Sequence, residues 1–164
     1  MKRHDSMRGY FAYELYRHMK ENKDIILLTG DLGYGMFDQI RSDIPEQFIN
    51  CGASEQAMMG IAVGLTMEGK ITFVYSITTF LLYRPFETIR NYIDHEKIPV
   101  KLIASGRGRD YEIDGFSHWS EDCAYFLQGF GNISEYWPSD KSEIPTIVKQ
   151  MIKSNNPEFL SLRR

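Results

Sequence analysis

The alternation of short apolar runs with longer segments of helical periodicity constrains the fold of this chain more than any other feature. One apolar run, DIILLTG at 24–30, ends in glycine and is typical of a strand buried on both faces of a sheet. Further strands are predicted at 47–52, 70–77, 98–105, 132–138 and 157–162. Helices are predicted at 7–21, 54–69, 81–97, 119–130 and 141–154, with a short one ending before Pro45. This alternation predicts an α/β fold, with a mostly parallel β-sheet sandwiched by helices.

The predicted topology also indicates where a ligand would bind. We expect a single domain over residues 1–164, because the chain has no internal repeat, low-complexity tract or linker. In parallel sheets of this kind, ligand sites lie beyond the carboxyl ends of the strands. The loops expected there are 30–36, 51–55 and 105–118, and they carry most of the unusual residues.

Composition limits the classes of function. The formal net charge of the 164 residues is −3, so the chain lacks the basic surface that binds nucleic acid or anionic membranes. No apolar run reaches the roughly 20 residues of a membrane span, and the N-terminus lacks the apolar core of a signal peptide. We therefore expect a cytoplasmic protein. Cys51 and Cys123 lack metal-ligand spacing and are interpreted as free, buried thiols, and no metal site made by this chain alone is predicted.

The segment NCGASEQAMMGIAVGLTMEG, residues 50–69, places one carboxylate at the start of an apolar helix. Glutamate is costly to bury, so Glu55 needs an explanation. One interpretation is structural: Ser54 caps the helix and Glu55 complements the helix dipole. The other is catalytic, because a carboxyl group partly withdrawn from water at a strand end suits general acid/base work. The residues alone leave both interpretations open.

Three aromatic residues in TFLLYRPF, residues 79–86, form a second candidate feature. Phe80, Tyr83 and Phe86 are spaced three residues apart, so on a helix they share a face. They form either ordinary core packing or a slot for a flat heterocycle.

Two predicted loops carry further polar candidates. In IDGFSH, residues 113–118, Asp114 and His118 are candidates for a proton shuttle or a substrate ligand, although a lone loop histidine is more often solvated. In TGDLGYG, residues 29–35, the glycine spacing does not match a phosphate loop and no lysine follows. A strand-to-helix turn that positions Asp31 is therefore favoured.

Taken in order, five segments of the chain resemble the pyrimidine-binding domain of transketolase over nearly its whole length. They are the Asp-Leu-Gly loop, FINCGASEQAMMGIAVGLTMEGK, TFLLYRPFETIR, DGFSH and PEFLSLRR. The resemblance is strongest to transketolases encoded as two separate subunits, of which this chain would be the C-terminal-section subunit. It implies a thiamine diphosphate-binding fold, thiamine diphosphate as cofactor, and two-carbon ketol transfer between sugars or sugar phosphates.

The resemblance implies roles for the residues that would meet the cofactor. Glu55 matches a catalytic glutamate that hydrogen-bonds a ring nitrogen of the cofactor's aminopyrimidine and so activates the cofactor's own base. Phe80, Tyr83 and Phe86 match the aromatic pocket around the pyrimidine ring.

The resemblance also implies a set of substrate-binding residues. Asp114 and His118 match a loop pair that faces the donor sugar's hydroxyls and the thiazolium, with His118 also catalytic. Asp31 matches an acidic residue near the substrate channel. Arg163 matches an arginine at the end of the last strand that binds substrate phosphate, and Arg8 matches another phosphate-binding arginine in the first helix.

The chain departs from the family pattern at the phosphate end of the substrate site. The family often has a serine where this chain has Gly35, and a histidine where it has Gly106. Arg107 and Arg109 are candidates for compensation, and the alternative is an acceptor other than an ordinary sugar phosphate.

Missing motifs imply a partner. The chain has no Gly-Asp-Gly followed at a distance by asparagine, the family's signature for the metal and diphosphate, and no third domain is expected. The resemblance therefore implies a diphosphate-domain (N-terminal-section) subunit, which would bind most of the diphosphate and the Mg or Ca ion. We expect a heterotetramer with two copies of each subunit and active sites at their interfaces.

Two alternative functions remain open from the sequence. One is a subunit of a thiamine diphosphate-dependent 2-oxoacid decarboxylase or carboligase; deoxyxylulose phosphate synthase also shares this domain. The other is a non-catalytic interaction subunit. The DGFSH loop favours ketol transfer over the first, and Glu55 with the aromatic triplet argues against the second.

Overall fold

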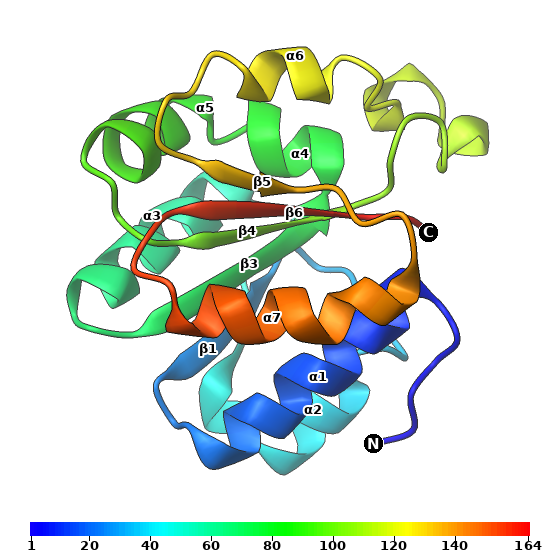
Figure 1. The fold of residues 1–164 in the computed structure, drawn as a ribbon, viewed down its shortest axis with the longest axis vertical. Helices are drawn as coiled ribbons and strands as arrows, with labels where there is room; N and C mark the ends of the chain where they lie inside the picture. Colours follow the sequence, from blue (N-terminus) through cyan, green and yellow to red (C-terminus); the bar gives the residue numbers. More distant parts are fainter.

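The computed structural model describes residues 1–164 and shows a six-stranded parallel β-sheet with helices on both faces (Figure 1). The strands are β1 (Ile25–Thr29), β2 (Phe48–Asn50), β3 (Ile71–Ile77), β4 (Lys101–Ser105), β5 (Ser134–Tyr136) and β6 (Glu158–Leu162). Their order across the sheet is β2-β1-β3-β4-β6-β5, and every neighbouring pair is parallel. The predicted α/β fold is confirmed.

Seven α-helices and several shorter helical turns accompany the strands. The helices are α1 (Met7–Glu21), α2 (Asp38–Asp43), α3 (Glu55–Met67), α4 (Thr78–Tyr83), α5 (Phe86–Thr88), α6 (Cys123–Leu127) and α7 (Ile144–Lys153). The π-helical segment η2 (Ile89–His95) continues α5, and the 3₁₀ turns are η1 (Pro45–Gln47), η3 (Glu112–Asp114), η4 (Phe116–His118) and η5 (Lys141–Glu143). None of these helices is both long and apolar enough to cross a bilayer.

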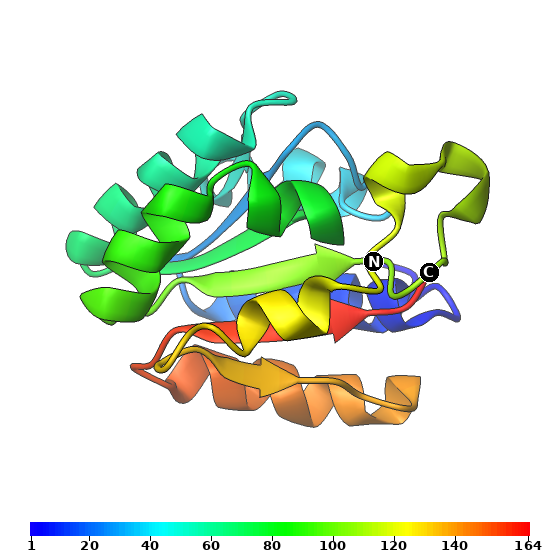
Figure 2. The same cartoon turned by 90° about the horizontal axis from the view of Figure 1, so that it is seen from above.

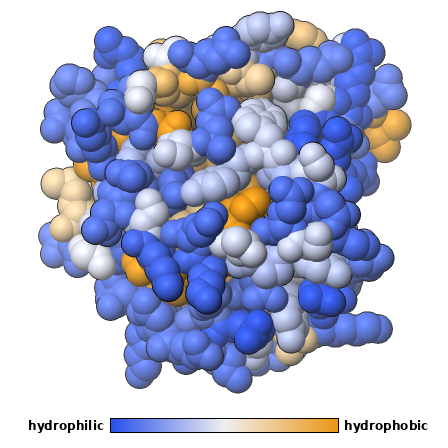
Figure 3. Space-filling view, viewed as in Figure 1, coloured by the Kyte–Doolittle hydropathy of each residue, from blue (hydrophilic) through white to orange (hydrophobic).

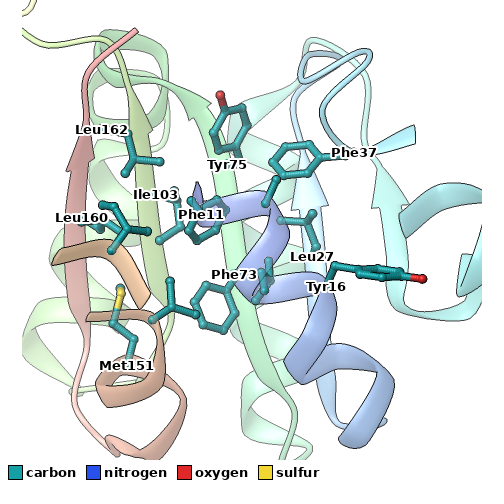
Figure 4. Close-up of a cluster of buried hydrophobic side chains, with 14 of the residues drawn as sticks. Phe11, Tyr16, Leu27, Phe37, Phe73, Tyr75, Ile103, Met151, Leu160 and Leu162 are labelled. Atoms are coloured by element: carbon teal, nitrogen blue, oxygen red, sulfur yellow. The ribbon is translucent and has the colours of Figure 1, made fainter. Parts of the chain in front are cut away.

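Successive residues of each central strand pack against different helices. Leu27 of β1 joins a buried cluster with α1 and α7, whereas Leu28 joins a second cluster with α3, α4 and α6. Figure 4 shows the first cluster, in which Phe11 of α1 packs on Phe73 and Tyr75 of β3 at ring-centre distances of 6.2 and 6.4 Å. Because helices cover both faces of the sheet, these strands are apolar at every position rather than at every second one.

The predicted continuous helix at 81–97 is wrong in its boundaries and its continuity. Helix α4 begins at Thr78, directly after β3, and ends at Tyr83; α5 starts again only at Phe86. Pro85 lies between the two helices and interrupts them, because proline has no backbone N–H to donate and its ring clashes with the preceding turn of a helix. The break separates Phe80 and Tyr83 on α4 from Phe86 on α5, so the three rings do not lie on one helix.

Both cysteines are free, but they differ in burial. Cys123 in α6 is fully buried, and its burial raises the pKa of the thiol to about 11. Cys51, just after β2, is only partly buried, so the prediction that both thiols are buried is wrong for Cys51. A thiol with the raised pKa of Cys123 is almost entirely protonated at neutral pH and is a poor nucleophile.

Candidate active site

The three predicted ligand loops start at the same edge of the sheet. They follow β1, β2 and β4, which are parallel and end at Thr29, Asn50 and Ser105. Figure 2 shows the loop that carries η3 and η4 at the edge toward which the strands point. Four of the candidate residues, Asp31, Glu55, Asp114 and His118, are therefore carried at the edge where a ligand site is expected.

Glu55 is the buried carboxylate of this edge, with 1% of its side chain exposed. Ser76 of β3 donates its hydroxyl to Glu55 Oε1 at 3.0 Å, and Arg84 donates Nη1 to Glu55 Oε2 at 2.6 Å. Ser54 occupies the N-cap position, but its hydroxyl donates to the Cys51 carbonyl at 2.6 Å and makes no side-chain cap. The capping interpretation is therefore wrong for Ser54. Tertiary partners, rather than the helix end alone, hold Glu55.

The backbone of Gly30, at the end of β1, lies directly against this carboxylate. A Cβ atom at Gly30 would lie 3.1 Å from Glu55 Oε1 and 3.3 Å from Ser76 Oγ. Both distances are tighter than ordinary packing, and Glu55 is enclosed on that side. A methyl group at position 30 would require the Glu55 carboxylate or the Ser76 hydroxyl to shift by a few tenths of an ångström.

Replacing Gly30 with alanine is expected to destabilise the fold by about 1–3 kcal/mol, the usual cost of inserting a methyl group into a packed site. Denaturant unfolding followed by circular dichroism measures this change. Gly131→Ala is the matched control, because a Cβ there meets no atom within 4 Å and should change stability by about 0.5 kcal/mol or less. Equal stability of the two variants would show that the Glu55 cradle tolerates a methyl group.

Phe80 lies between Arg84 and His118. The Arg84 guanidinium carbon is 3.7 Å from the centre of the Phe80 ring, and the His118 ring meets Phe80 edge-on at 4.8 Å. The His118 Nδ1 hydrogen-bonds the Ser117 hydroxyl at 3.0 Å. A chain of direct contacts thus connects Glu55 of α3, through Arg84 and Phe80 of the α4 region, to His118 of η4.

Tyr83 and Phe86 face a different neighbour. Both meet the Phe126 ring of α6 edge-on, with ring centres 5.0 and 5.2 Å apart. Phe86 and Phe126 also line a groove of about 880 Å³. Figure 3, drawn in the view of Figure 1, shows apolar side chains in the upper part of the molecule, where α5 and α6 lie. Glu55 does not line this groove. The structure therefore connects Phe80 to His118 directly and to Glu55 through Arg84, and it brings Tyr83 and Phe86 together on the α6 side.

Asp31 occupies a strained turn just after β1. Its φ of 58° lies in the left-handed region that non-glycine residues seldom adopt. The carboxylate accepts hydrogen bonds from the Tyr34 hydroxyl and from Asn50 Nδ2, the latter at 3.0 Å, and these donors lower the pKa of Asp31 below its usual range. Asp114, in η3, is exposed and has no side-chain hydrogen bond. Asp31 is thus a fixed acceptor, whereas Asp114 is free to meet a ligand.

Arg8 of α1 lines a second cavity of about 330 Å³, together with residues of the glycine loop. Its Nη1 donates to the Tyr111 hydroxyl at 3.1 Å, and its buried Nε has no hydrogen-bond partner. Tyr111 also hydrogen-bonds the Ser105 hydroxyl at 2.7 Å, and its ring covers Gly106, where an added Cβ would lie 2.3 Å from the ring. Tyr111 therefore fills the space that a side chain at position 106 would need.

The remaining arginines have different surroundings. Arg163 is exposed just beyond β6. Arg107 is anchored to the Ser161 carbonyl at 2.8 Å, and burial together with the nearby charge of Arg163 lowers the pKa of Arg107. Arg109 pairs with Glu121 at 3.0 Å. Protein groups already hold Arg107 and Arg109, which leaves Arg163 as the free cation of this group.

The chain is thus an α/β domain with a buried carboxylate, Glu55, at the carboxyl edge of its parallel sheet. A sequence model of the family described as "Transketolase, pyrimidine binding domain" matches residues 5–164. The chain therefore belongs to the transketolase pyrimidine-binding domain family, as the sequence resemblance indicates.

Individual relatives agree with this assignment. A protein of Methanocaldococcus jannaschii, provisionally named as a transketolase C-terminal section, is 28% identical over 96% of this chain and 50% of its own length. A 6-deoxy-6-sulfo-D-fructose transketolase subunit of Clostridium sp. is 24% identical over 96% of this chain and 49% of its own length. The solved structure of a split-gene transketolase, described as an inactive β4 tetramer, matches 98% of this chain and 52% of its own with a TM-score of 0.86 and 30% identity. This chain thus spans about half the length of these relatives.

The residues present fit the aminopyrimidine part of thiamine diphosphate, the cofactor of this family. Glu55 offers a carboxylate withdrawn from water, and the Gly30 backbone leaves room for it. The Arg84 guanidinium is a stand-in, because it shows that a flat group with N–H donors can lie on Phe80 and reach Glu55. Glu55 and Phe80 would hold the ring here.

Sequence reasoning missed three residues of the site: Gly30, Ser76 and Arg84. Arg84 stands inside the segment TFLLYRPF, beside the aromatic residues that spacing singled out, but nothing in the spacing marked it. Ser76 is 21 residues from Glu55 in sequence, and the packing of α3 on β3 brings it to the carboxylate.

Proposed function

We propose that this chain is the pyrimidine-domain part of a transketolase-like transferase that uses thiamine diphosphate to move two-carbon ketol units between sugars. The observation that carries the proposal is the buried Glu55 carboxylate, held by Ser76 and linked through Arg84 to the Phe80 ring. When bound, thiamine diphosphate supplies the carbon nucleophile. Glu55 would orient the ring and hold a proton at its carboxylate, since a carboxyl group withdrawn from water exchanges a proton with a ring nitrogen more readily than a solvated one.

The other residues would bind and orient the substrate. Asp31, Asp114 and His118 stand at the same edge as Glu55 and present acceptors and an imidazole to sugar hydroxyl groups. Arg163 and the Arg8 cavity would receive an anionic or polar end of the substrate. Tyr83 and Phe86, which pack on Phe126, would contact the cofactor from the α6 side, apart from the contacts of Glu55 and Phe80.

A diphosphate-domain subunit would complete the active site. No group of three or more His, Cys, Asp or Glu side chains of this chain is close enough to hold a metal ion, so Mg or Ca would rest on the partner. The proposed assembly is a heterotetramer with two copies of each subunit, located in the cytoplasm. The name of one relative, a transketolase subunit, supports the division into subunits.

Reconstitution tests this function. The chain would be co-expressed with the protein or domain from its own source that carries the Gly-Asp-Gly and asparagine signature, and two-carbon transfer would be assayed with ketose donors and with 2-oxoacids. Turnover of ketoses that depends on thiamine diphosphate supports the proposal. Turnover of 2-oxoacids alone would assign a decarboxylase or carboligase, and failure of the two chains to co-elute at micromolar concentration would refute the assembly.

Replacing His118 with alanine is expected to lower donor turnover by about 10²-fold, the lower end of what a general acid or base contributes. The dissociation constant for thiamine diphosphate should stay within about twofold, because His118 meets Phe80 edge-on and its side-chain hydrogen bond goes to Ser117. Steady-state kinetics and calorimetry on the same preparation measure both. Phe116→Ala is the control, since Phe116 is 82% exposed in the same loop. Equal loss of turnover and cofactor affinity would contradict this role.

A further inference from the structure

Arg84 makes the two contacts that a bound aminopyrimidine ring would need. Its Nη1 donates to Glu55 Oε2 at 2.6 Å, and its guanidinium carbon lies 3.7 Å from the centre of the Phe80 ring. A guanidinium is planar, weakly hydrated and edged with N–H donors, so it resembles the edge of a nitrogen heterocycle. A carboxylate oxygen can accept two hydrogen bonds, but the face of Phe80 that the Arg84 guanidinium covers cannot also hold a cofactor ring.

The two partners of this ion pair differ in their freedom to move. Glu55 is 1% exposed, fixed in the first turn of α3 and held at Oε1 by Ser76. Arg84 is 45% exposed and follows the last residue of α4, just before the break at Pro85. Arg84 can turn its long side chain into water without moving a helix, whereas Glu55 cannot leave its place.

We propose that Arg84 is a positioning residue, an exchangeable counter-ion of Glu55. It pairs with the carboxylate before the cofactor arrives and gives up Oε2 and the Phe80 face when the aminopyrimidine binds. This inference rests on the proposed function, because it requires that Glu55 and Phe80 receive the cofactor ring.

The exchange follows from the energetics of burial. A carboxylate buried without a partner is costly, and Arg84 supplies that partner in the cofactor-free chain. The same contact must break before the cofactor can bind, so Arg84 lowers the apparent affinity for thiamine diphosphate. Ser76 keeps its hydrogen bond to Oε1 in both states, so the carboxylate stays aimed while its other oxygen changes partner.

The test measures thiamine diphosphate affinity of the reconstituted complex by calorimetry. Arg84→Met is expected to lower the dissociation constant by about tenfold or more, because the cofactor no longer displaces a counter-ion. The melting temperature of the cofactor-free chain should fall in the same variant, since Glu55 then lacks its partner. Arg90→Met is the matched control, because Arg90 is an exposed arginine nearby whose side chain bonds only Asn91.

Two further variants separate the exchange from a general structural effect. In a Glu55→Gln background, Arg84→Met should give little or none of the tenfold gain, because the pair that it breaks is already gone. Arg84→Lys should give a smaller gain than Arg84→Met and a smaller loss of melting temperature, since lysine pairs with Glu55 but cannot lie flat on Phe80. Arg84→Lys also keeps the test possible if Arg84→Met folds poorly.

The measured affinities for thiamine diphosphate can also contradict the proposed role of Arg84. Weaker cofactor binding by Arg84→Met would mean that Arg84 is a cofactor ligand. Binding equal to that of Arg90→Met would mean that the ion pair does not compete with the cofactor. Either result overturns the inference and leaves the proposed function intact. A wild-type complex that binds no thiamine diphosphate would overturn the proposed function, and this inference with it.

Discussion

Replacing Glu55 with glutamine is expected to lower two-carbon transfer by the reconstituted enzyme by about 10²- to 10⁴-fold, the range of general acid/base contributions. Glutamine has the same size and can still accept the Ser76 hydroxyl, but a neutral amide cannot exchange a proton with a ring nitrogen. Turnover at saturating cofactor measures the loss. The free energy of unfolding should change by about 1 kcal/mol or less, because the partly exposed Arg84 side chain can turn to water.

The matched control for this variant is Glu87→Gln. Glu87 is an exposed glutamate on α5, outside the set of residues proposed to bind cofactor or substrate, and its substitution should leave turnover unchanged. Full activity of Glu55→Gln would rule out Glu55 as the activating residue. Loss of activity together with a large loss of stability would assign Glu55 a structural role instead.

Replacing Lys101 with methionine is expected to destabilise the fold by about 3–5 kcal/mol, the usual cost of removing one partner from a buried ion pair. Lys101 and Glu158 are 1% and 3% exposed, and Nζ lies 2.7 Å from Glu158 Oε2. Lys101 also donates to the carbonyls of Ser154 and Asn156 at 2.9 and 2.6 Å, and burial lowers its pKa. Methionine would leave Glu158 with Tyr136 as its remaining donor, at 2.9 Å.

Urea unfolding of three variants measures this effect. Lys70→Met removes an exposed pair with Asp24, 37% and 59% exposed, and should cost about 0–1 kcal/mol. The double variant Lys101→Met with Glu158→Gln should recover part of the loss, because it leaves no unpaired buried charge. A Lys101→Met variant as stable as Lys70→Met would show that water reaches Glu158 in the folded chain.

Much of the fold could be predicted from local patterns. The apolar runs around β1, β3, β4 and β6 identified the central strands, because strands covered on both faces must be apolar throughout. Their alternation with helices predicted the parallel sheet. The helix at 81–97 was the exception, since its apolar period continues through Pro85 while the backbone does not.

The candidate site was predictable only in part. The sequence singled out Glu55, Phe80 and His118, and the structure places them in one chain of contacts through Arg84. Spacing also predicted a shared face for Phe80, Tyr83 and Phe86. Phe86 lies beyond the break between α4 and α5, and Tyr83 and Phe86 both pack on Phe126 of α6. The roles of these residues remain the predictions that the experiments above address.

The sequence by itself determined the central strands and most of the helices, because these depend on neighbours within a few residues. Their alternation then indicated a parallel sheet and the edge at which a ligand would bind. The sequence also identified Glu55 as unusual, since an acidic residue before an apolar helix stands out locally. Only the tertiary structure decided what surrounds Glu55: Ser76 and Arg84 lie 21 and 29 residues away, and Gly30 approaches from another strand. Contacts over such separations arise from the packing of elements, and no local pattern records which side chains that packing brings together.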